Sequence, residues 1–422
     1  MTAIGTQQAP PSIDADRWPD VAVAAGSPVR AAVARALFTR AVGRLPLLVR
    51  FPDGRLLGAG ATGAPVMLLH RPQAFFRRFG ASGLIGFGES YLAGDWDCAD
   101  LTELLTVLAS HVTDLIPPRL QRLRTMAVRR RPPADRQTRE GARRNVGHHY
   151  DLSNELFALF LDETMTYSSA LFATDPGGTP EAGEHLLAQA QRRKIDRLLD
   201  RAGVGPGCRL LEVGTGWGEL ALRAARRGAT VVTVTISREQ QALAQQRVAE
   251  EGLDRQVSVQ LRDYRDIEGT YDAIVSCEMI EAVGERYWDG YLAALDRHLA
   301  PGGRIGLQAI TMSHDRMLAT THTYTWIHKY IFPGGQLPSI TAIQNSLASS
   351  TRLWVIDRDD FGPHYAETLR IWRDRFNARA AEVAALGFDE VFNRMWTFYL
   401  CYSEAGFRSG YLDVTQLTLA RI

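Results

Sequence analysis

Regular alternation of strand and helix patterns after residue 185 constrains the fold of this chain most strongly. Short apolar runs, several of them rich in β-branched residues, predict strands at Arg209–Val213, Thr230–Thr235, Val257–Leu261, Ala273–Ser276 and Gly303–Ile310. Helical patterns separate them at Leu220–Arg227, Glu239–Glu250 and Tyr287–His298. Such alternation predicts an α/β fold, in which helices cover both faces of a mostly parallel sheet. The tail, Thr368–Ile422, predicts two helices and a closing strand near Leu412–Thr418.

A glycine-rich loop follows the first of these strands, with the sequence Glu212-Val213-Gly214-Thr215-Gly216-Trp217-Gly218. Glycines let the backbone turn tightly and approach a ligand closely. Ligands of open α/β sheets bind beside such turns, at the carboxyl ends of the strands. The third glycine arrives one residue too early for the dinucleotide fingerprint Gly-x-Gly-x-x-Gly. The loop therefore favours an adenosyl ligand, with a plain tight turn as the alternative.

Polar residues also follow the next two strands. Thr235 and Ser237 come after the second strand with Gln240 one helical turn later, and Asp263-Tyr264 follows the third. A carboxylate can accept a hydrogen bond from the exocyclic amine of adenine, while the tyrosine ring offers a stacking face. The alternatives are a helix cap for Ser237 and an ordinary turn acid for Asp263.

Before the α/β region the chain predicts three further segments. Residues 1–27 resemble a flexible tail. Residues 28–112 predict a small α+β domain, with helices at Ala31–Val42 and Leu101–Leu108 and strands at Leu47–Phe51 and Val66–Leu69. Residues 113–142 form a basic linker, because ten arginines stand against two acids between Arg119 and Arg144. The linker is either a solvated charge run or a surface for anionic lipid headgroups, each cation being worth about 1 kcal/mol there.

Composition excludes several classes of protein. The net charge of +1 and the lack of a recognition motif give no reason to expect nucleic-acid binding. Four scattered cysteines predict neither a metal site nor a disulfide framework. No run approaches the roughly 20 apolar residues of a membrane span, and the first twenty residues do not resemble a secretory signal. A cytoplasmic location, peripheral to the inner face of the membrane, is expected.

Several separated motifs resemble the cyclopropane fatty-acid synthase family of S-adenosylmethionine-dependent methyltransferases. Besides the glycine loop and the segment Thr235–Gln240, they are His148–Asn154, Met165–Ser168, Lys329–Gly335 and Phe407-Arg408. Gly88–Trp96 is similar to the amino-terminal domain of the longer, phospholipid-acting members. The resemblance implies a class I methyltransferase domain at 143–422 with a seven-stranded sheet. It also implies an unsaturated phospholipid acyl chain at the membrane surface as substrate, and a possible homodimer.

The resemblance also implies which residues hold S-adenosylmethionine. The expected cofactor-binding residues are Tyr167, Ser168, Gly214, Gly216, Thr235 and Gln240, with Asp263 and Tyr264 at the adenine end and His149 closing over the cofactor.

The chain departs from the family at the cradle that holds a bicarbonate ion in cyclopropane-forming members. Ser169 replaces the usual Cys and Gln308 the usual His, whereas Glu281, Tyr365 and the Ile310 position are kept. A further acid, Glu278, stands where a small glycine is usual. A carboxylate about 4 Å from bicarbonate would repel it by about 4 kcal/mol at an effective dielectric constant of ~20. We therefore hypothesise that bicarbonate is not used and that Glu278 replaces it as the general base.

A different base can give a different product. Ring closure after methyl transfer yields a cyclopropane, whereas a hydride shift before proton loss yields an exocyclic methylene group. The altered cradle resembles relatives that methylate oleoyl phospholipid at C10 on the route to tuberculostearic acid, where a separate flavin or NADPH reductase would complete the pathway. Cyclopropanation is the alternative. A non-catalytic lipid-binding protein and a small-molecule methyltransferase are further alternatives, which the intact cofactor motifs and the amino-terminal domain disfavour.

Overall fold

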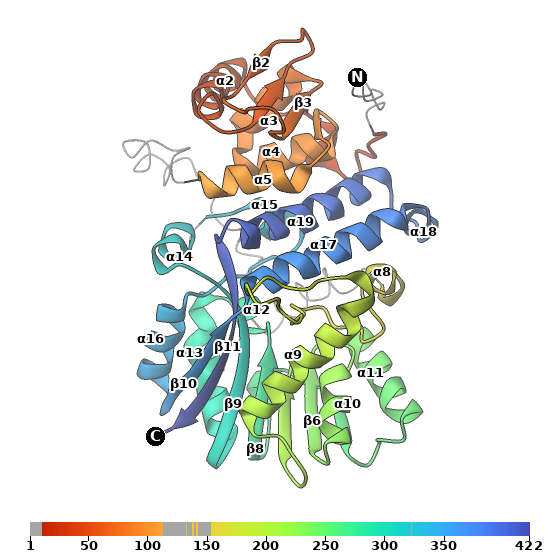
Figure 1. Ribbon diagram of the computed structural model, residues 1–422, viewed down its shortest axis with the longest axis vertical. Coiled ribbons are helices and arrows are strands. Elements are labelled where there is room, and N and C mark those ends of the chain that lie inside the picture. Colours follow the sequence, from red (N-terminus) through yellow and green to blue (C-terminus); the bar gives the residue numbers. More distant parts are fainter. Residues whose placement is uncertain (1–10, 113–131, 133–136, 139–140, 142–152, 322) are drawn as a thin grey trace. The chain divides into compact units, whose positions relative to one another are not determined.

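The computed structural model describes residues 11–112, 132, 137–138, 141, 153–321 and 323–422 (Figure 1). The chain divides into two compact units. Unit 1 comprises Met1–Arg129 and Phe376–Ser409, and unit 2 comprises Arg130–Arg375 and Gly410–Ile422. This division differs from the expected domain at 143–422, because Phe376–Ser409 groups with the amino-terminal segment. The expected basic linker at 113–142 lies almost wholly outside the described residues.

Unit 2 is built on a seven-stranded sheet with the order β10-β11-β9-β8-β5-β6-β7 (Figure 1). The strands are β5 (Arg209–Val213), β6 (Thr230–Thr235), β7 (Val257–Leu261), β8 (Tyr271–Cys277), β9 (Leu299–Met312), β10 (Leu353–Asp360) and β11 (Leu412–Arg421). Strands β5 to β9 pair in parallel, whereas β11 runs antiparallel to β9 and β10. The expected α/β fold with a mostly parallel sheet is confirmed.

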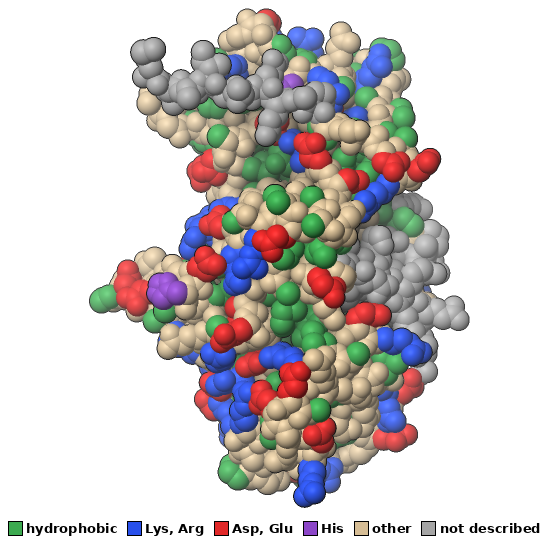
Figure 2. Space-filling model, turned by 90° about the vertical axis from the view of Figure 1, so that its right-hand side faces the viewer, with side chains coloured by type: hydrophobic (Ala, Val, Ile, Leu, Met, Phe, Trp, Pro, Cys, Tyr) green, Lys and Arg blue, Asp and Glu red, His purple; other side chains and the backbone are tan. Residues whose placement is uncertain are grey.

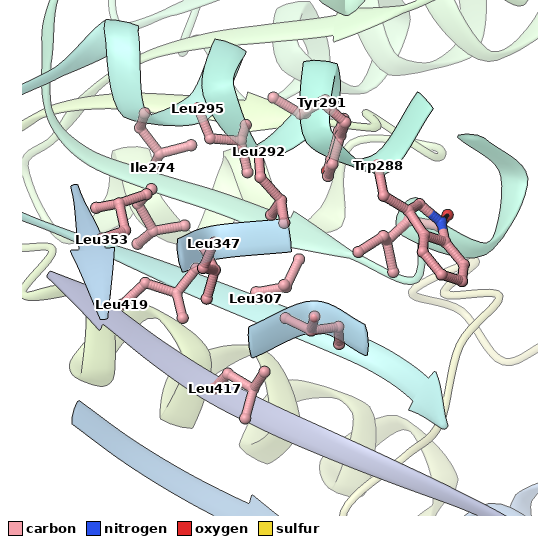
Figure 3. Close-up of a cluster of buried hydrophobic side chains, with 14 of the residues drawn as sticks. Ile274, Trp288, Tyr291, Leu292, Leu295, Leu307, Leu347, Leu353, Leu417 and Leu419 are labelled. Carbon is pink, nitrogen blue, oxygen red and sulfur yellow. Dashed lines mark hydrogen bonds between the residues drawn. The ribbon is translucent and has the colours of Figure 1, made fainter. Parts of the chain in front are cut away.

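Helices cover both faces of this sheet because alternate side chains of each strand point to opposite faces. On one face Leu210 of β5 packs with α9 (Leu187–Ala202), α10 (Glu219–Arg226) and α11 (Arg238–Glu250). On the other, Leu211 packs with α12 (Ile280–Val283), α13 (Trp288–His298) and α16 (Ile340–Ser350). Figure 3 shows this second core, in which Leu292 and Leu295 of α13 lie over Leu307 of β9. Both apolar cores hold the carboxyl ends of the parallel strands at one edge.

The carboxyl-terminal half contains elements that the sequence did not predict. Strand β10 and helix α16 were not expected, and three helices precede β11 where two were predicted. The reason is composition: half of β10 is acidic or basic, and α16 is rich in Ser and Thr, which are poor helix formers. The remaining helices are α8 (Asn154–Phe160), α14 (His314–Thr320), α15 (Trp326–Tyr330), α17 (Gly362–Ala378), α18 (Ala380–Ala385) and α19 (Glu390–Arg408).

Unit 1 contains a four-stranded sheet with the order β2-β1-β3-β4. The strands are β1 (Leu48–Arg50), β2 (Leu56–Leu57), β3 (Val66–Leu69) and β4 (Trp96–Cys98). The helices of its amino-terminal segment are α1 (Pro19–Ala22), α2 (Pro28–Val42), α3 (Pro72–Ser82), α4 (Leu84–Leu92) and α5 (Leu101–Ser110). The small sheet domain expected here is confirmed, and the side chain of Asp100 caps α5 as its position before the predicted helix suggests.

Two parts of unit 1 differ from expectation. Within the expected flexible tail, Val21 of α1 is fully buried and its carbonyl accepts a hydrogen bond from Arg78 Nη2 (2.7 Å), so the tail is anchored at this residue. Helix α19 joins this unit because its partners lie there. Arg394 Nε donates to the carbonyl of Tyr91 (2.8 Å), and Thr102 Oγ1 of α5 donates to Glu404 Oε2 (3.2 Å).

The surface carries both signs of charge. On the face shown in Figure 2, acidic and basic side chains are interspersed with apolar ones over the described residues. Among those residues, no helix is both long enough and apolar enough to cross a bilayer.

Candidate active site

A cavity in unit 2 lies at the carboxyl ends of β5, β6 and β8. Eight of the nine predicted cofactor residues line it: Tyr167, Ser168, Gly214, Gly216, Thr235, Gln240, Asp263 and Tyr264. The ninth, His149, lies outside the described residues. Glu278 lines the same cavity. Residues from widely separated parts of the chain therefore meet where an α/β sheet binds its ligand.

The glycine loop forms a concave wall of this cavity. Gly214 has a φ of +100°, and a Cβ there would stand 2.6 Å from Met279 Cγ, so only glycine fits without displacement. Gly216 has a φ of +52°, and a Cβ there would meet nothing within 4 Å. The amides of Gly214 and Thr215 donate to the carbonyl of Val234 in β6, and the amide of Gly218 donates to the carbonyl of Thr215 and closes the turn. The loop thus leaves open space for a ligand such as S-adenosylmethionine.

The second and third strand ends add polar groups to the cavity. Thr235 Oγ1 donates to Gln240 Oε1 (2.8 Å), which holds the two predicted residues together. Ser237 caps α11 by accepting from the amide of Gln240 (3.2 Å), as its alternative interpretation predicted. Asp263 accepts from Arg265 at both carboxylate oxygens (2.7 and 2.9 Å). A carboxylate has about four acceptor positions, so Asp263 retains capacity for an adenine amine.

The segment before α9 supplies the opposite wall. The ring of Tyr167 stacks on Trp372 with centroids 5.2 Å apart. Ser168 is held from α9, because Gln191 Nε2 donates to its carbonyl (2.8 Å) and Lys194 Nζ donates to its hydroxyl (2.5 Å). The two α9 side chains therefore fix the predicted cofactor segment against the sheet.

The carboxylate of Glu278 is the centre of a second group of predicted residues. It accepts hydrogen bonds from Ser169 N (3.1 Å), Gln308 Nε2 (2.8 Å) and Tyr365 Oη (2.7 Å). Its backbone has a φ of +51°, a conformation that favours glycine and costs other residues about 1–2 kcal/mol. The departures from the family cradle thus meet at one carboxylate, which faces the cofactor cavity.

Burial raises the pKa values of the acids of this site. Desolvation raises the pKa of Glu278, opposed by the charge of Lys194 and by its hydrogen bonds. Desolvation, followed by the charge of Glu278, raises the pKa of Glu281 to about 8, and Glu281 Oε1 accepts from Ile310 N (2.5 Å). Desolvation also raises the pKa of Glu212 to about 8. Buried carboxyl groups with strongly shifted pKa values in a cavity are typical of functional sites.

Three polar residues of the site were missed from the sequence. Lys194 occupies an apolar position in the α9 pattern, which was the available signal. Arg265 follows Asp263 by two residues and gave no distinctive signal. Gln416 of β11 donates to Gln308 Oε1 (3.0 Å), so that the Gln308 amide nitrogen is directed at Glu278. Only the fold brings this distant glutamine to the site.

Comparison with known proteins identifies the family of this chain. A model of the mycolic acid cyclopropane synthetase family matches residues 137–417. Tuberculostearic acid methyltransferase UfaA1 of Mycobacterium tuberculosis is 55% identical over 424 residues, covering 100% of this chain and 99% of that protein. Cyclopropane-fatty-acyl-phospholipid synthase of Escherichia coli is 35% identical over 85% of this chain and 88% of its own length.

Solved structures show the same fold. The cyclopropane synthase MmaA2 of Mycobacterium tuberculosis has a TM-score of 0.60 and 33% identity, covering 66% of this chain and 98% of its own. Mycolic acid cyclopropane synthase CmaA1, complexed with SAH and CTAB, has a TM-score of 0.58 and 33% identity, covering 68% of this chain and 98% of its own. The chain therefore belongs to the mycolic acid cyclopropane synthetase family and, as its sequence predicted, is an S-adenosylmethionine-dependent fatty-acid methyltransferase.

Proposed function

We propose that this enzyme methylates an oleoyl chain of a phospholipid at C10 and forms a 10-methylene-stearoyl chain, a precursor of tuberculostearic acid. Two similarities support the substrate and the product. The 55% identical relative is named a tuberculostearic acid methyltransferase, and the 35% identical relative is named a fatty-acyl-phospholipid synthase. The observation that carries the proposal is the carboxylate of Glu278, held by three donors at the wall of the cofactor cavity.

Bound S-adenosylmethionine supplies an electrophilic methyl group. After the new carbon–carbon bond has formed at C10, the acyl chain carries a carbocation at C9. A 1,2-hydride shift moves this charge to C10, and loss of one proton from the new methyl group then leaves an exocyclic double bond. The carboxylate of Glu278 stabilises the cation by its charge and accepts the proton. Tyr365 and Gln308 hold the carboxylate in place.

Glu278 also accounts for the proposed absence of bicarbonate from the reaction. The donors at the Ser169 and Gln308 positions, and the Tyr365 hydroxyl, are already bonded to its carboxylate. A second anion in this place would lack those donors and would face a like charge. Turnover in bicarbonate-depleted buffer should therefore equal turnover in bicarbonate-containing buffer.

The product distinguishes the proposal from cyclopropanation. Both products of dioleoyl phospholipid have the same mass, so proton NMR of the extracted lipid is the appropriate measurement. Exomethylene signals are expected. High-field cyclopropyl signals would show that the site closes a ring, which is the activity named for the 35% identical relative. An exomethylene product would need a separate flavin or NADPH reductase to become the saturated 10-methyl chain.

Contact with the membrane is proposed to involve helix α2. Its outer face exposes Val29, Val33 and Leu37 at helical spacing, with residue exposures of 74%, 54% and 46%. The helix carries three arginines and no acid. An apolar stripe beside cations suits the surface of an anionic membrane, where the enzyme would reach its phospholipid substrate from the inner, cytoplasmic side.

A binding measurement tests the main alternative to this function. A non-catalytic lipid-binding protein should not bind S-adenosylmethionine, whereas the preserved cavity predicts binding that isothermal titration calorimetry would detect.

A homodimer, which the family resemblance implies, would appear as twice the 46.8 kDa chain mass in light scattering.

A further inference from the structure

One cation in the cavity wall lacks a partner of opposite charge at ion-pair distance. The side chain of Lys194 is 1% exposed, and its ammonium donates to Ser168 Oγ (2.5 Å) and contacts Cys277 Sγ (3.6 Å). Within the described part of the chain, no carboxylate oxygen lies within 4 Å of this nitrogen. Burying an unpaired charge costs several kcal/mol, so buried charges normally have a partner or a function.

The choice of lysine at this position is itself unusual. The chain contains 48 basic residues, of which only Lys194 and Lys329 are lysines, so the other 46 are arginines. Lys194 faces inward from α9 between Gln191 and Leu198, which are fully buried. An ammonium is a compact point charge, whereas a guanidinium is a broad planar fork. The site thus uses the smaller cation in a chain that otherwise uses arginine.

The groups around this ammonium identify its counter-charge. Its charge lowers the pKa of three neighbours, Glu212, Cys277 and Glu278. Desolvation raises the pKa of all three groups, to about 8 for Glu212 and to about 11 for the Cys277 thiol, and the charge of Lys194 is the largest influence that opposes it at Glu278. Glu278 alone of the three carboxyl or thiol groups accepts three hydrogen bonds, which favour its ionised form.

We propose that Lys194 is a positioning residue whose ammonium is the counter-ion that keeps Glu278 ionised. This inference rests on the proposed role of Glu278 as the base. Among the described residues, the titratable groups whose charges or hydrogen bonds act on Glu278 are Lys194 of α9, Tyr365 of α17, Glu281 of α12 and Cys277 of β8. Lys194 is the only cation among them.

Separation of the two charges suits a base. A contact ion pair would occupy the lone pairs of the carboxylate and resist protonation. Beyond contact distance, the ammonium bonds to Ser168, while its field still favours the charged form of Glu278. The carboxylate therefore stays ionised before the reaction and remains able to accept a proton from the acyl chain.

The pH dependence of kcat/KM tests the counter-ion in the whole enzyme. Lys194→Met should move the acid limb of the profile to higher pH by about one unit or more, because the charge of Lys194 lowers the pKa of Glu278 and a nearby opposite charge typically does so by about 1–3 units. Arg192→Met removes a cation from the exposed face of the same helix, where Arg192 pairs with Glu163, and should leave the limb in place. An unmoved limb in Lys194→Met would overturn the proposal.

Chemical rescue separates charge from packing. Added propylammonium should raise the turnover of the Lys194→Ala variant at least tenfold, whereas propanol, which is of similar size, should not. Equal rescue by both compounds would show that Lys194 only fills space, and would refute the counter-ion role.

A stability cycle gives a readout that does not need turnover. The fall in Tm caused by Lys194→Met should be clearly smaller in a Glu278→Gln background than in the wild type, since neither charge then lacks its partner. The same comparison with Glu212→Gln should show little coupling. Coupling to Glu212 instead would assign the counter-charge to that acid and overturn the proposal.

Failure of the inference can be told from failure of the proposed base. If Glu278→Gln is inactive but Lys194→Met keeps its pH profile, the base stands and the counter-ion is wrong. If Glu278→Gln turns over normally, the base is wrong, and the stability cycle still reports whether the two charges interact.

Discussion

Replacing Glu278 by glutamine removes one negative charge from the cavity while leaving the size of the side chain almost unchanged. The amide oxygen can still accept from Ser169 N and Gln308 Nε2, which both bond to one oxygen of the native carboxylate. The amide nitrogen can donate to the hydroxyl of Tyr365, which now bonds to the other oxygen. Every hydrogen bond has a replacement. The Lys194 ammonium nevertheless loses its proposed counter-charge, so the free energy of unfolding should fall by about 1–4 kcal/mol, the energy of a pKa shift of about 1–3 units.

The effect on turnover should be much larger. A positioned general base contributes about 10²–10⁴-fold to a rate, and glutamine can neither accept the proton nor offset the cationic charge. A loss of that size corresponds to about 3–5 kcal/mol of activation free energy. The affinity for S-adenosylmethionine should change by less than threefold or so, since the predicted cofactor residues keep their contacts.

Three measurements on one preparation of the Glu278→Gln variant test whether Glu278 is the base. Calorimetry gives the cofactor affinity, thermal unfolding gives the stability, and proton NMR of lipid from dioleoyl phospholipid gives the turnover and the product. Turnover within tenfold of the wild type, in a variant that is folded and binds cofactor, would refute Glu278 as the base. Lost activity together with lost cofactor binding would instead show that Glu278 supports the cavity.

Other perturbations test the surrounding structure. Glu212→Gln should flatten the decline in Tm between pH 5 and pH 8. A carboxyl group whose folded pKa is raised to about 8 stabilises the fold at pH values below its unfolded pKa and loses that contribution as the pH rises through 8. Calorimetric scans at both pH values measure the change in Tm. Gly214→Ala should weaken cofactor binding at least tenfold and should cost more stability than Gly216→Ala. A Cβ at position 214 would stand 2.6 Å from a side-chain atom, whereas a Cβ at position 216 would meet nothing within 4 Å. Calorimetric titration and thermal unfolding compare the two variants. Val33→Asp should reduce sedimentation with phosphatidylglycerol vesicles several-fold, whereas Leu386→Asp, at an exposed residue outside α2, should not; equal losses would exclude a specific role for α2.

Much of the cofactor site could be predicted from the sequence because its signals are local. The glycine loop, the Thr235–Gln240 segment and Asp263 each follow a strand whose apolar pattern is evident. Parallel strands bring their carboxyl ends to one edge of the sheet, so local patterns were enough to predict that these residues meet. Strands β5, β6 and β7 begin and end at the predicted residues for the same reason.

Elements with mixed or polar patterns were not predictable in this way. Strand β10 lies at the edge of the sheet, where charged side chains can reach solvent, so its sequence lacks the apolar run that identified the inner strands. Helix α19 groups with unit 1 through contacts such as that of Arg394 with the carbonyl of Tyr91, far away in the sequence. No local pattern contains that information.

The sequence by itself determined the class of fold, the cofactor loop and the identity of the residues that depart from the family cradle. Only the tertiary structure decided how those departures are related. Ser169, Glu278, Gln308 and Tyr365 come from four separate segments, and folding joins them through the hydrogen bonds of one carboxylate. Folding also buries Lys194 beside them, because the inward face of α9 packs on the sheet. Strand and helix patterns depend on neighbours along the chain, whereas charge balance in a buried site depends on neighbours in space.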